Sequence, residues 1–485
     1  MRRKLYMETF GCQMNVLDSE LVLGQLRAIG FESVDDRDSA DVILYNTCSV
    51  REHAEQKVWS RLGELRPRKA ADPGLIIGVI GCLAERDGKN LFRKYPHIDL
   101  LCGPGELDKL AGLVHNAAVT APGPRPRHQS ALMGANVRRS STLAAAEDSL
   151  EMLDLSRSIS PSDASAQAYV RITRGCNKFC TYCVVPYTRG PEVHRPPQNI
   201  IDEVKKLTDA GSREVTLLGQ TINHYAYEHP DGRTTTFADL LYAVHEAVPH
   251  LPRLRFVTSF PRDFTDQALI AMRDCPRICR YLHVPAQHGS DRILKMMNRG
   301  YTAGQYREFL ARARQLMPDL SVASDFIVGF PTETDEDFAQ TVWLLSESRF
   351  KNSFIFKYSP RPGTAAIDRF PDDIPESTKR RRNNELLAAQ HAVCEELNRQ
   401  MIGKRVEVLV EGPSKLLSRR NGNGGGVELG WETRGKGAAG CQMVGRTRGD
   451  QVVVFDGSES LAGQFLDMQI IDARNMTLFG AAARN

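Results

Sequence analysis

The sequence predicts an α/β protein in three parts: an N-terminal parallel α/β sheet domain, a central incomplete (β/α)6 TIM-like barrel and a C-terminal small β-barrel. Two patterns predict this class. Over most of the chain, apolar strand-like segments alternate with amphipathic helical segments, as in parallel sheets covered by helices. Beyond residue 404 the apolar segments become short and glycine separates them, as in small β-barrels.

The N-terminal domain is expected over residues 1–118, where the strand-like KLYMETF, DVILYN, LIIGVIG and HIDLLC each precede a helical segment. Cys12, Cys48 and Cys82 directly follow the first three of these strands. Because the carboxyl ends of parallel strands lie along one edge of a sheet, we expect the three thiols to converge. Cys102 ends the fourth strand and is a rival member of the set. A single cysteine after a strand is more often a small buried apolar residue, so the shared placement is what indicates a site.

Residues 119–166 are rich in alanine, proline, serine and arginine, which predicts a linker with at most short ordered pieces. The central barrel is expected over residues 167–375. Its six strand-like segments are AYVRIT, EVTLLG, LRFVTS, YLHVPA, VASDFIVGF and NSFIFKY. In a barrel of this kind the site lies at the carboxyl ends of the strands.

A charged connecting helix is expected over residues 376–403, and a β-barrel over residues 404–485. The strand-like segments of this barrel are RVEVLVEG, QMVGRTRG, QVVVFDG and LDMQIIDARNMTLFG. The glycine-rich stretch from residue 421 to 440 predicts a mobile loop within the module.

The composition indicates a protein without a membrane segment. No apolar run approaches the roughly 20 residues needed to cross a bilayer, and the opening MRRKLYMETFGC lacks the apolar core of a signal peptide. We therefore expect a cytoplasmic location and no membrane partner. The eleven cysteines then favour thiolate ligands and core residues over disulfides. The net charge of +4 is too small to identify a nucleic-acid partner.

A three-cysteine motif directly follows the first barrel strand. Cys176, Cys180 and Cys183 have the spacing C-x3-C-x2-C, and no second CxxC-like pair follows to complete a zinc site. Three thiolates on a four-iron cubane leave one iron open. That iron can chelate S-adenosylmethionine beside a cluster that donates one electron, which yields a 5′-deoxyadenosyl radical. The alternatives are zinc with a distant fourth ligand, or thiols that bind nothing.

Several motifs together resemble the radical-SAM methylthiotransferases, and most closely the tRNA branch that acts on isopentenyl-adenosine. They are METFGCQMNVLDSE, NTCSVREHAEQKVWSRLG, GVIGCLAER, GCNKFCTYCVVPYTRG, QHGSDRILKMMNRGYT, DFIVGFPTETDEDF and QMVGRTRGDQVVVFDG. The likeness covers nearly the whole chain except the linker and the glycine-rich loop. Gln13 and Met14 in GCQMN resemble this branch, whereas the ribosomal-protein and threonylcarbamoyl-adenosine branches usually differ there.

The resemblance implies an enzyme with two 4Fe–4S clusters and S-adenosylmethionine as cofactors. It would convert isopentenyl-adenosine at position 37 of tRNA, beside the anticodon, to its 2-methylthio derivative. Carbon 2 of adenine has no acidic proton, so a radical would abstract its hydrogen. The auxiliary cluster would hold the sulfur, while one S-adenosylmethionine supplies the methyl group and another the radical. The resemblance assigns Cys12, Cys48 and Cys82, rather than Cys102, to the auxiliary cluster, and Cys176, Cys180 and Cys183 to the radical-SAM cluster.

Further site residues are expected at the ends of predicted barrel strands, where polar side chains can line the cofactor or adenine pocket. Hydrogen-bonded buried polar residues are the alternative interpretation. The terminal barrel resembles the RNA-binding TRAM module, and such barrels present loops and strand faces to single-stranded RNA. The pocket candidates are Gln220, Asn223, Ser259, Gln287 and Asp325, and the RNA-binding candidates are Arg446 and Arg448.

Two alternatives to this function stay open. One is a methylthiotransferase acting on threonylcarbamoyl-adenosine tRNA or on a ribosomal protein, and the other is a non-catalytic iron-sulfur or zinc RNA-binding protein. For the enzyme we expect as partners the tRNA anticodon stem-loop, an electron donor and a sulfur source, and we expect a monomer. We also expect removal of residues 404–485 to weaken tRNA binding while leaving S-adenosylmethionine cleavage largely intact.

Overall fold

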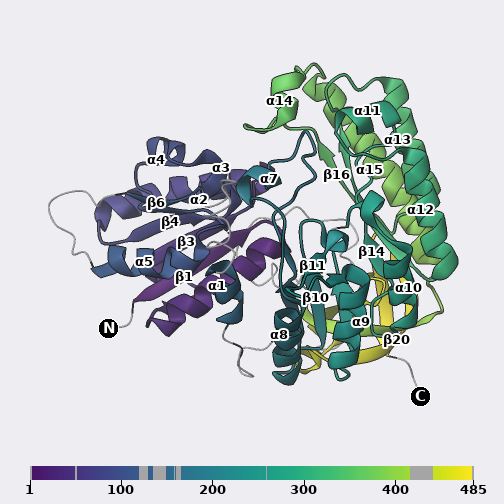
Figure 1. Ribbon diagram of the computed structural model, residues 1–485, viewed down its shortest axis with the longest axis horizontal. Helices are drawn as coiled ribbons and strands as arrows, with labels where there is room; N and C mark the ends of the chain where they lie inside the picture. Colours follow the sequence, from purple (N-terminus) through teal and green to yellow (C-terminus); the bar gives the residue numbers. More distant parts are fainter. Residues whose placement is uncertain are drawn as a thin grey trace.

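The computed structural model describes residues 3–49, 52–119, 129–134, 149–157, 159, 165–257, 259–414 and 441–482. The predicted glycine-rich loop at 421–440 lies outside these ranges. Figure 1 shows a lobe built on the N-terminal sheet beside a larger lobe that holds the central barrel, with the C-terminal strands packed against the larger lobe. None of the described helices is long and apolar enough to cross a membrane.

A parallel six-stranded sheet forms the core of the N-terminal lobe, in the order β2-β1-β3-β4-β5-β6. Its central strands β3 and β4 are buried on both faces, as expected for a parallel sheet covered by helices. The strands are β1 (Lys4–Phe10), β2 (Glu32–Ser33), β3 (Val42–Thr47), β4 (Ile76–Ile80), β5 (Leu100–Cys102) and β6 (Ser130–Leu132). The helices are α1 (Gln13–Ala28), α2 (Glu52–Ala71), α3 (Cys82–Asp87), α4 (Asn90–Lys94) and α5 (Leu110–Val119).

Two short pieces of the segment predicted as a linker are ordered. β6 extends the sheet beside β5, and residues 149–155 are helical. Asp154 in this helix is buried and accepts from the guanidinium of Arg171 at 2.6 Å. Arg171 also donates to Asp18 of α1 at 2.7 Å, so buried ion pairs join the two lobes.

The central barrel is open and contains the six predicted strands in chain order. β7, β10 and β13 form one parallel sheet and β14, β15 and β16 another, and a bridge between Leu254 and Ile278 connects them. The strands are β7 (Gln167–Arg171), β10 (Glu214–Leu218), β13 (Arg253–Phe256), β14 (Tyr281–His283), β15 (Ser321–Val328) and β16 (Asn352–Lys357). Short strands β8 (Thr173–Arg174) and β9 (Val193–His194) pair beside the first strand, and β11 (Ala226–Glu228) pairs with β12 (Thr234–Thr236).

Amphipathic helices cover the outside of the barrel, which Figure 1 shows along the edge of the larger lobe. Threonine caps at the start of α9, α12 and α13 accept from the third helical amide, which fixes where these helices begin. The helices are α7 (Val185–Thr188), α8 (Pro197–Asp209), α9 (Phe237–Ala247), α10 (Asp266–Asp274), α11 (Asp291–Met296), α12 (Ala303–Leu316), α13 (Asp335–Ser348), α14 (Ala365–Arg369) and α15 (Glu376–Arg399).

The C-terminal strands close into a five-stranded barrel in the order β17-β18-β19-β21-β20. The last predicted segment, LDMQIIDARNMTLFG, forms two strands because the chain turns at Asn475, whose φ is +52°. The strands are β17 (Arg405–Pro413), β18 (Cys441–Thr447), β19 (Val452–Gly457), β20 (Phe465–Arg474) and β21 (Thr477–Ala482).

The C-terminal barrel is docked on the central barrel through buried arginines. The fully buried Arg253 donates to the main-chain oxygens of Glu407 at 2.9 Å and of Arg446 at 3.0 Å. Arg255 donates to the oxygen of Thr447 at 3.3 Å. Removing the C-terminal barrel would leave both guanidiniums without these partners, so the contacts do not favour the expectation that it can be deleted without disturbing the cofactor domain.

Candidate active site

Cys176, Cys180 and Cys183, here called the clamp, lie in the loop between β8 and α7 at the carboxyl end of β7. The amide of Cys183 donates to the carbonyl of Cys180 at 3.0 Å, and the amide of Cys176 donates to Gly190 at 3.1 Å. Gly175 has φ +65°, and a Cβ there would lie 1.9 Å from the oxygen of Pro191. Only glycine fits, so the start of the clamp is held in one backbone conformation.

The loop that follows α11 supports the clamp from the other side. The amide of Thr181 donates to the carbonyl of Met297 at 3.1 Å. The side chain of Asn298 donates to the carbonyl of Phe179 at 3.0 Å, where Phe179 has the positive φ of +49°. These contacts bring together two segments that are more than a hundred residues apart in the chain.

Arg299 places a cation next to the clamp. Its guanidinium is buried and donates to the Sγ of Cys180 at 3.3 Å, to Tyr301 at 3.1 Å and to the carbonyl of Pro285 at 3.2 Å. A fixed positive charge favours the thiolate form of a cysteine. Our sequence analysis did not assign this arginine a role, although it lies in the quoted QHGSDRILKMMNRGYT.

The clamp thiols fit a metal cluster. Burial raises the pKa of Cys176, and burial followed by the adjacent Cys180 raises that of Cys183. Three crowded thiols therefore do not ionise together without a compensating cation. An iron cluster supplies that cation and takes thiolates as its usual ligands.

A second group of three cysteines lies at the carboxyl edge of the N-terminal sheet. Cys12 is the N-cap of α1, Cys48 directly follows β3, and Cys82 is the first residue of α3 after β4. The amide of Cys48 donates to the carbonyl of Phe10 at 2.9 Å, which holds the ends of β1 and β3 together. The expected convergence of the three segments is therefore present in the structure.

Close packing fixes these cysteines. A Cβ on Gly11, whose φ is +156°, would lie 2.7 Å from the Cβ of Cys48 and 2.5 Å from the Oδ1 of Asn15. Asn15 is buried and accepts from the amide and the thiol of Cys12, each at 3.3 Å. It also donates to the side chain of Asn46 at 3.0 Å. A buried amide network thus orients the Cys12 side chain.

Cys102 differs from these three. Its thiol donates to the carbonyls of Glu106 at 3.4 Å and of Gly103 at 3.6 Å. Burial, with the nearby carboxylate of Glu106, raises its pKa well above the usual value. A protonated, hydrogen-bonded thiol in an apolar core is a poor metal ligand.

Arg189, at the end of α7, connects the clamp to the second cysteine group. Its guanidinium donates to Asp18 of α1 at 2.8 Å, and α7 packs against α3. A hydrogen bond from Cys48, and then the charge of Arg189, lower the pKa of Cys12 to about 6 despite burial. Burial raises the pKa of Cys82, and Arg189 opposes that rise. One cation from the clamp segment therefore acts on two thiols of the other group.

A cavity of about 510 Å³ lies beside the clamp. Ser49, the residue after Cys48, lines one side, and Cys183 of the clamp lines another. The remaining wall carries apolar side chains with a few polar and basic ones. These residues are Gln56, Tyr182, Val184, Gln287, Asp325, Ile327, Ile355, Phe356, Lys357, Tyr358, Ser359, Arg361 and Asn383.

The predicted pocket residues divide into three kinds. Gln287 and Asp325 line the cavity, and Asp325 contacts the Nε2 of His283 at 3.0 Å. Asn223 is used structurally, since its side chain exchanges hydrogen bonds of 2.7 and 2.8 Å with the main chain of Phe260.

Gln220 and Ser259 do not line this cavity. Gln220 is half-buried after β10. Ser259 is buried, and its hydroxyl has no hydrogen-bond partner among the described residues. An unpartnered buried hydroxyl can accept a polar cofactor atom.

Arg446 and Arg448 lie where the two barrels meet. Arg446 pairs with Glu411 at 2.8 Å and with Asp450 at 3.0 Å. The guanidinium of Arg448 donates to the main-chain oxygen of Pro276. Their role in RNA binding stays a prediction, and both are about one third exposed.

Comparison with known proteins identifies the family. Residues 170–345 match the radical SAM superfamily, and residues 4–103 match the uncharacterized protein family UPF0004. A Rhodopirellula baltica protein named tRNA-2-methylthio-N(6)-dimethylallyladenosine synthase is 45% identical over 480 residues, covering 99% of this chain and 95% of the relative. The chain belongs to the radical-SAM methylthiotransferase family. It is accordingly an enzyme of that family, with two 4Fe–4S clusters and S-adenosylmethionine as cofactors.

Other known proteins are similar to this chain. A Porphyromonas gingivalis protein of the same name is 42% identical, covering 99% of this chain and 94% of the relative. Among solved structures, the radical S-adenosylmethionine methyltransferase TsrM from Kitasatospora setae has a TM-score of 0.49 and 15% identity, covering 76% of this chain and 74% of that one.

Proposed function

We propose that this radical-SAM methylthiotransferase acts on tRNA and converts isopentenyl-adenosine beside the anticodon to its 2-methylthio derivative. The single observation that carries the proposal is a cavity lined by Cys183 of the clamp and by Ser49, the residue that follows Cys48. Ser49 and Cys183 line the same space of about 510 Å³, so a group bound there is within reach of both. A reaction that abstracts a hydrogen and then inserts sulfur needs both centres beside one substrate carbon.

We assign the cysteines as follows. Cys176, Cys180 and Cys183 hold the radical-SAM cluster, and Cys12, Cys48 and Cys82 hold the auxiliary cluster. Bound together, the clusters and S-adenosylmethionine supply the radical, the sulfur and the methyl group. Support comes from the placement of each group at strand ends and from the fit of crowded thiols to a cationic cluster.

The chain's own residues position and enclose these groups. Arg299 donates to the Sγ of Cys180, and the charge of Arg189 lowers the pKa of Cys12. Ile327, Ile355 and Phe356 give the cavity an apolar wall that suits an isopentenyl group. Ile327 and Ile355 are half-buried and Phe356 is 38% exposed, so a bound substrate would cover this wall and shield the radical from water.

Polar side chains in the same cavity can recognise the adenine ring or the cofactor. Gln287 and Asn383 each carry an amide, which can donate to one ring nitrogen and accept from an exocyclic amine. Lys357 also lines the cavity and forms an ion pair with Glu376, so a phosphate of the RNA backbone would compete with that carboxylate for it. The name of the relatives supports the same substrate, since it specifies dimethylallyladenosine in tRNA.

We also propose that the enzyme works in the cytoplasm as a monomer, with the anticodon stem-loop as its RNA target. An electron donor that reduces the clusters and a sulfur source that supplies the inserted sulfur are further partners in this proposal.

The proposed function is tested with the reconstituted enzyme and tRNA that carries isopentenyl-adenosine. We expect about eight iron atoms per chain if both sites hold four-iron clusters, cleavage of S-adenosylmethionine under reductant, and a methylthio nucleoside on digestion of the tRNA. Parallel reactions with threonylcarbamoyl-adenosine tRNA and with ribosomal protein should give no product. Product from either of these, with none from isopentenyl-adenosine tRNA, would contradict the proposal.

A further inference from the structure

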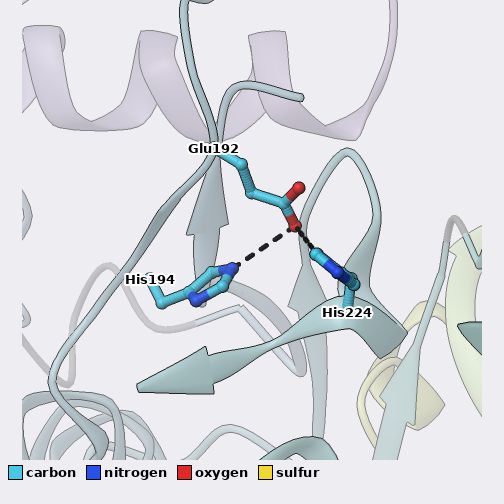
Figure 2. Close-up of side chains that lie close together, drawn as sticks. All are labelled: Glu192, His194 and His224. Atoms are coloured by element: carbon cyan, nitrogen blue, oxygen red, sulfur yellow. Dashed lines mark hydrogen bonds and ion pairs between the residues drawn. The ribbon is translucent and has the colours of Figure 1, made fainter. Parts of the chain in front are cut away.

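Glu192, His194 and His224 form a compact group that neither cysteine set uses. Figure 2 shows the Glu192 carboxylate directed toward both imidazoles. Its Oε1 lies 3.0 Å from the Nδ1 of His224 and 3.3 Å from the Nε2 of His194, and the three ligand atoms lie within 4.8 Å of one another. Glu192 directly precedes β9, His194 ends β9, and His224 ends the short helix after β10, so two segments of the chain meet here.

The carboxylate of Glu192 is buried and incompletely satisfied. Its side chain is only 2% exposed, yet its Oε2 has no hydrogen-bond partner among the described residues. Leaving a charged buried oxygen without a partner is costly. A cation at this position would satisfy it.

The tautomer of His194 also favours a cation beside Glu192. Its Nδ1 lies 2.6 Å from the carbonyl of Ala226, a distance that requires a donated hydrogen. The amide of Ala226 lies 3.2 Å from the same nitrogen, but a nitrogen that donates cannot also accept, and the shorter contact sets the tautomer. Neutral His194 then turns the lone pair of Nε2 toward the carboxylate of Glu192. Two lone pairs face each other unless a proton or a metal ion lies between them.

The nearby lysine is already paired. The charge of Lys178 works to lower the pKa of His224, but this lysine forms an ion pair with Asp263. The main-chain amide of Glu192 donates to the side chain of Asn177 at 3.3 Å, which holds the segment in place. Among the described residues, the ion pairs of Glu192 are those with His194 and His224.

We propose that Glu192, His194 and His224 bind one divalent transition-metal ion of the zinc class. Two imidazole nitrogens and one carboxylate are a common donor set for such ions. In a tetrahedral site with bonds of about 2.1 Å the ligand atoms lie about 3.4 Å apart, close to the two contacts at Glu192. His224 is 45% exposed, so a small rotation can close the site, and water completes the coordination.

The ion would brace the clamp. The segment that carries Glu192 begins at Gly190, whose carbonyl accepts from the amide of Cys176. The segment that carries His224 begins at Thr221, whose hydroxyl lies 3.4 Å from the Sγ of Cys176. A metal ion that joins the two segments would therefore hold Gly190 and Thr221, the two residues that contact Cys176, in place.

The test uses the enzyme with both clusters in place, dialysed anaerobically against buffered Zn²⁺. We expect about one zinc per chain in addition to the full complement of iron. The zinc X-ray absorption edge should show nitrogen and oxygen ligands and no sulfur. Zinc should also raise the unfolding temperature, since an ion that binds only the folded chain stabilises it.

Glu192→Gln and His224→Ala should each lose this zinc while keeping iron and cluster absorbance. His250→Ala, which removes an exposed histidine elsewhere, is the matched control and should keep the zinc. No bound zinc in the wild-type enzyme would overturn the proposal. Sulfur ligands at the zinc edge, or equal zinc in wild type, Glu192→Gln and His224→Ala, would also overturn it.

Discussion

The guanidinium of Arg189 donates to the carboxylate of Asp18 at 2.8 Å, and neither side chain is more than 6% exposed. Arg189 follows the clamp, and Asp18 lies on α1, whose N-cap is Cys12. The pair therefore sets the relative position of the two elements that carry the proposed cluster ligands. Its burial makes it sensitive to the loss of either partner.

Arg189→Met should impair the auxiliary cluster site and methylthio product formation. Breaking a buried ion pair typically costs about 3–5 kcal/mol, and the loss leaves Asp18 with Arg171 as its remaining buried partner. We expect a lower unfolding temperature, loss of iron from the auxiliary site, and little methylthio product. The double variant Arg189→Met, Asp18→Asn should recover part of the stability because no buried charge stays unpaired. Full product from Arg189→Met would show that this pair does not position the site.

Cys176→Ala should abolish production of 5′-deoxyadenosine. The clamp has three thiolates for its cluster, so the loss of one leaves too few anchors. The measurement is deoxyadenosine by liquid chromatography after incubation with S-adenosylmethionine and reductant. Cys275→Ala, which removes a buried cysteine outside both groups, is the control and should leave the yield unchanged. Normal yield from Cys176→Ala would remove this residue from the ligand set.

Cys48→Ala and Cys102→Ala should behave oppositely. Cys48→Ala should lose the auxiliary cluster, keep the clamp cluster, cleave S-adenosylmethionine and form no methylthio product. Cys102→Ala should keep both clusters and the product, since its thiol donates to main-chain carbonyls. Iron content, absorbance and nucleoside analysis on the same preparations distinguish them. The assignment of Cys82 over Cys102 is wrong if Cys102→Ala loses the auxiliary cluster and Cys82→Ala keeps it.

Asp325→Asn should change how stability depends on pH. Burial works to lower the pKa of His283, but the carboxylate of Asp325 outweighs it and the net pKa is raised. A histidine whose pKa is higher in the folded state contributes stability that is complete below its unfolded value of about 6.5. That contribution is lost as pH rises through the folded value.

The difference in denaturation midpoint between wild type and Asp325→Asn should therefore be largest near pH 6 and shrink above it. Repeating the series in a His283→Gln background should remove this trend. A difference that grows with pH would contradict the proposed ion pair.

Deleting residues 404–485 should destabilise the central barrel as well as weaken tRNA binding. Arg253 would lose its contacts with Glu407 and Arg446, and Arg255 its contact with Thr447. We expect a lower unfolding temperature and reduced S-adenosylmethionine cleavage. Arg253→Met in the truncated chain should restore part of the stability, with Arg255 kept because it pairs with the buried Glu214 at 3.1 Å. A truncated chain as stable as the full one would show that the docking contacts contribute little.

The sequence was sufficient for the elements whose pattern is local. The alternation of apolar strands and amphipathic helices predicts β1, β3, β4 and the six barrel strands, and their order in the sheets follows from right-handed crossovers. The convergence of Cys12, Cys48 and Cys82 follows from the same rule, because strand ends share an edge. β6 was not expected, since its three residues lie in a segment rich in loop-forming residues.

The functional residues that sequence reasoning missed depend on distant contacts. Arg189 and Arg299 are ordinary basic residues in the sequence, and only the fold brings one to Asp18 and the other to Cys180. Glu192 and His224 lie 32 positions apart, so no local motif marks their contact. For Asn223 the sequence predicted a role that the structure does not show. Its place at a strand end predicts a ligand contact, but its side-chain amide donates to the main chain of Phe260.

The central claim is that two cysteine groups act on one substrate in the shared cavity. The most direct measurement is nucleoside mass spectrometry of isopentenyl-adenosine tRNA after reaction with the wild-type enzyme and with Cys48→Ala. The account predicts 2-methylthio-isopentenyl-adenosine from wild type, and unmodified isopentenyl-adenosine together with continued deoxyadenosine formation from Cys48→Ala. Methylthio product from Cys48→Ala at the wild-type level would contradict it.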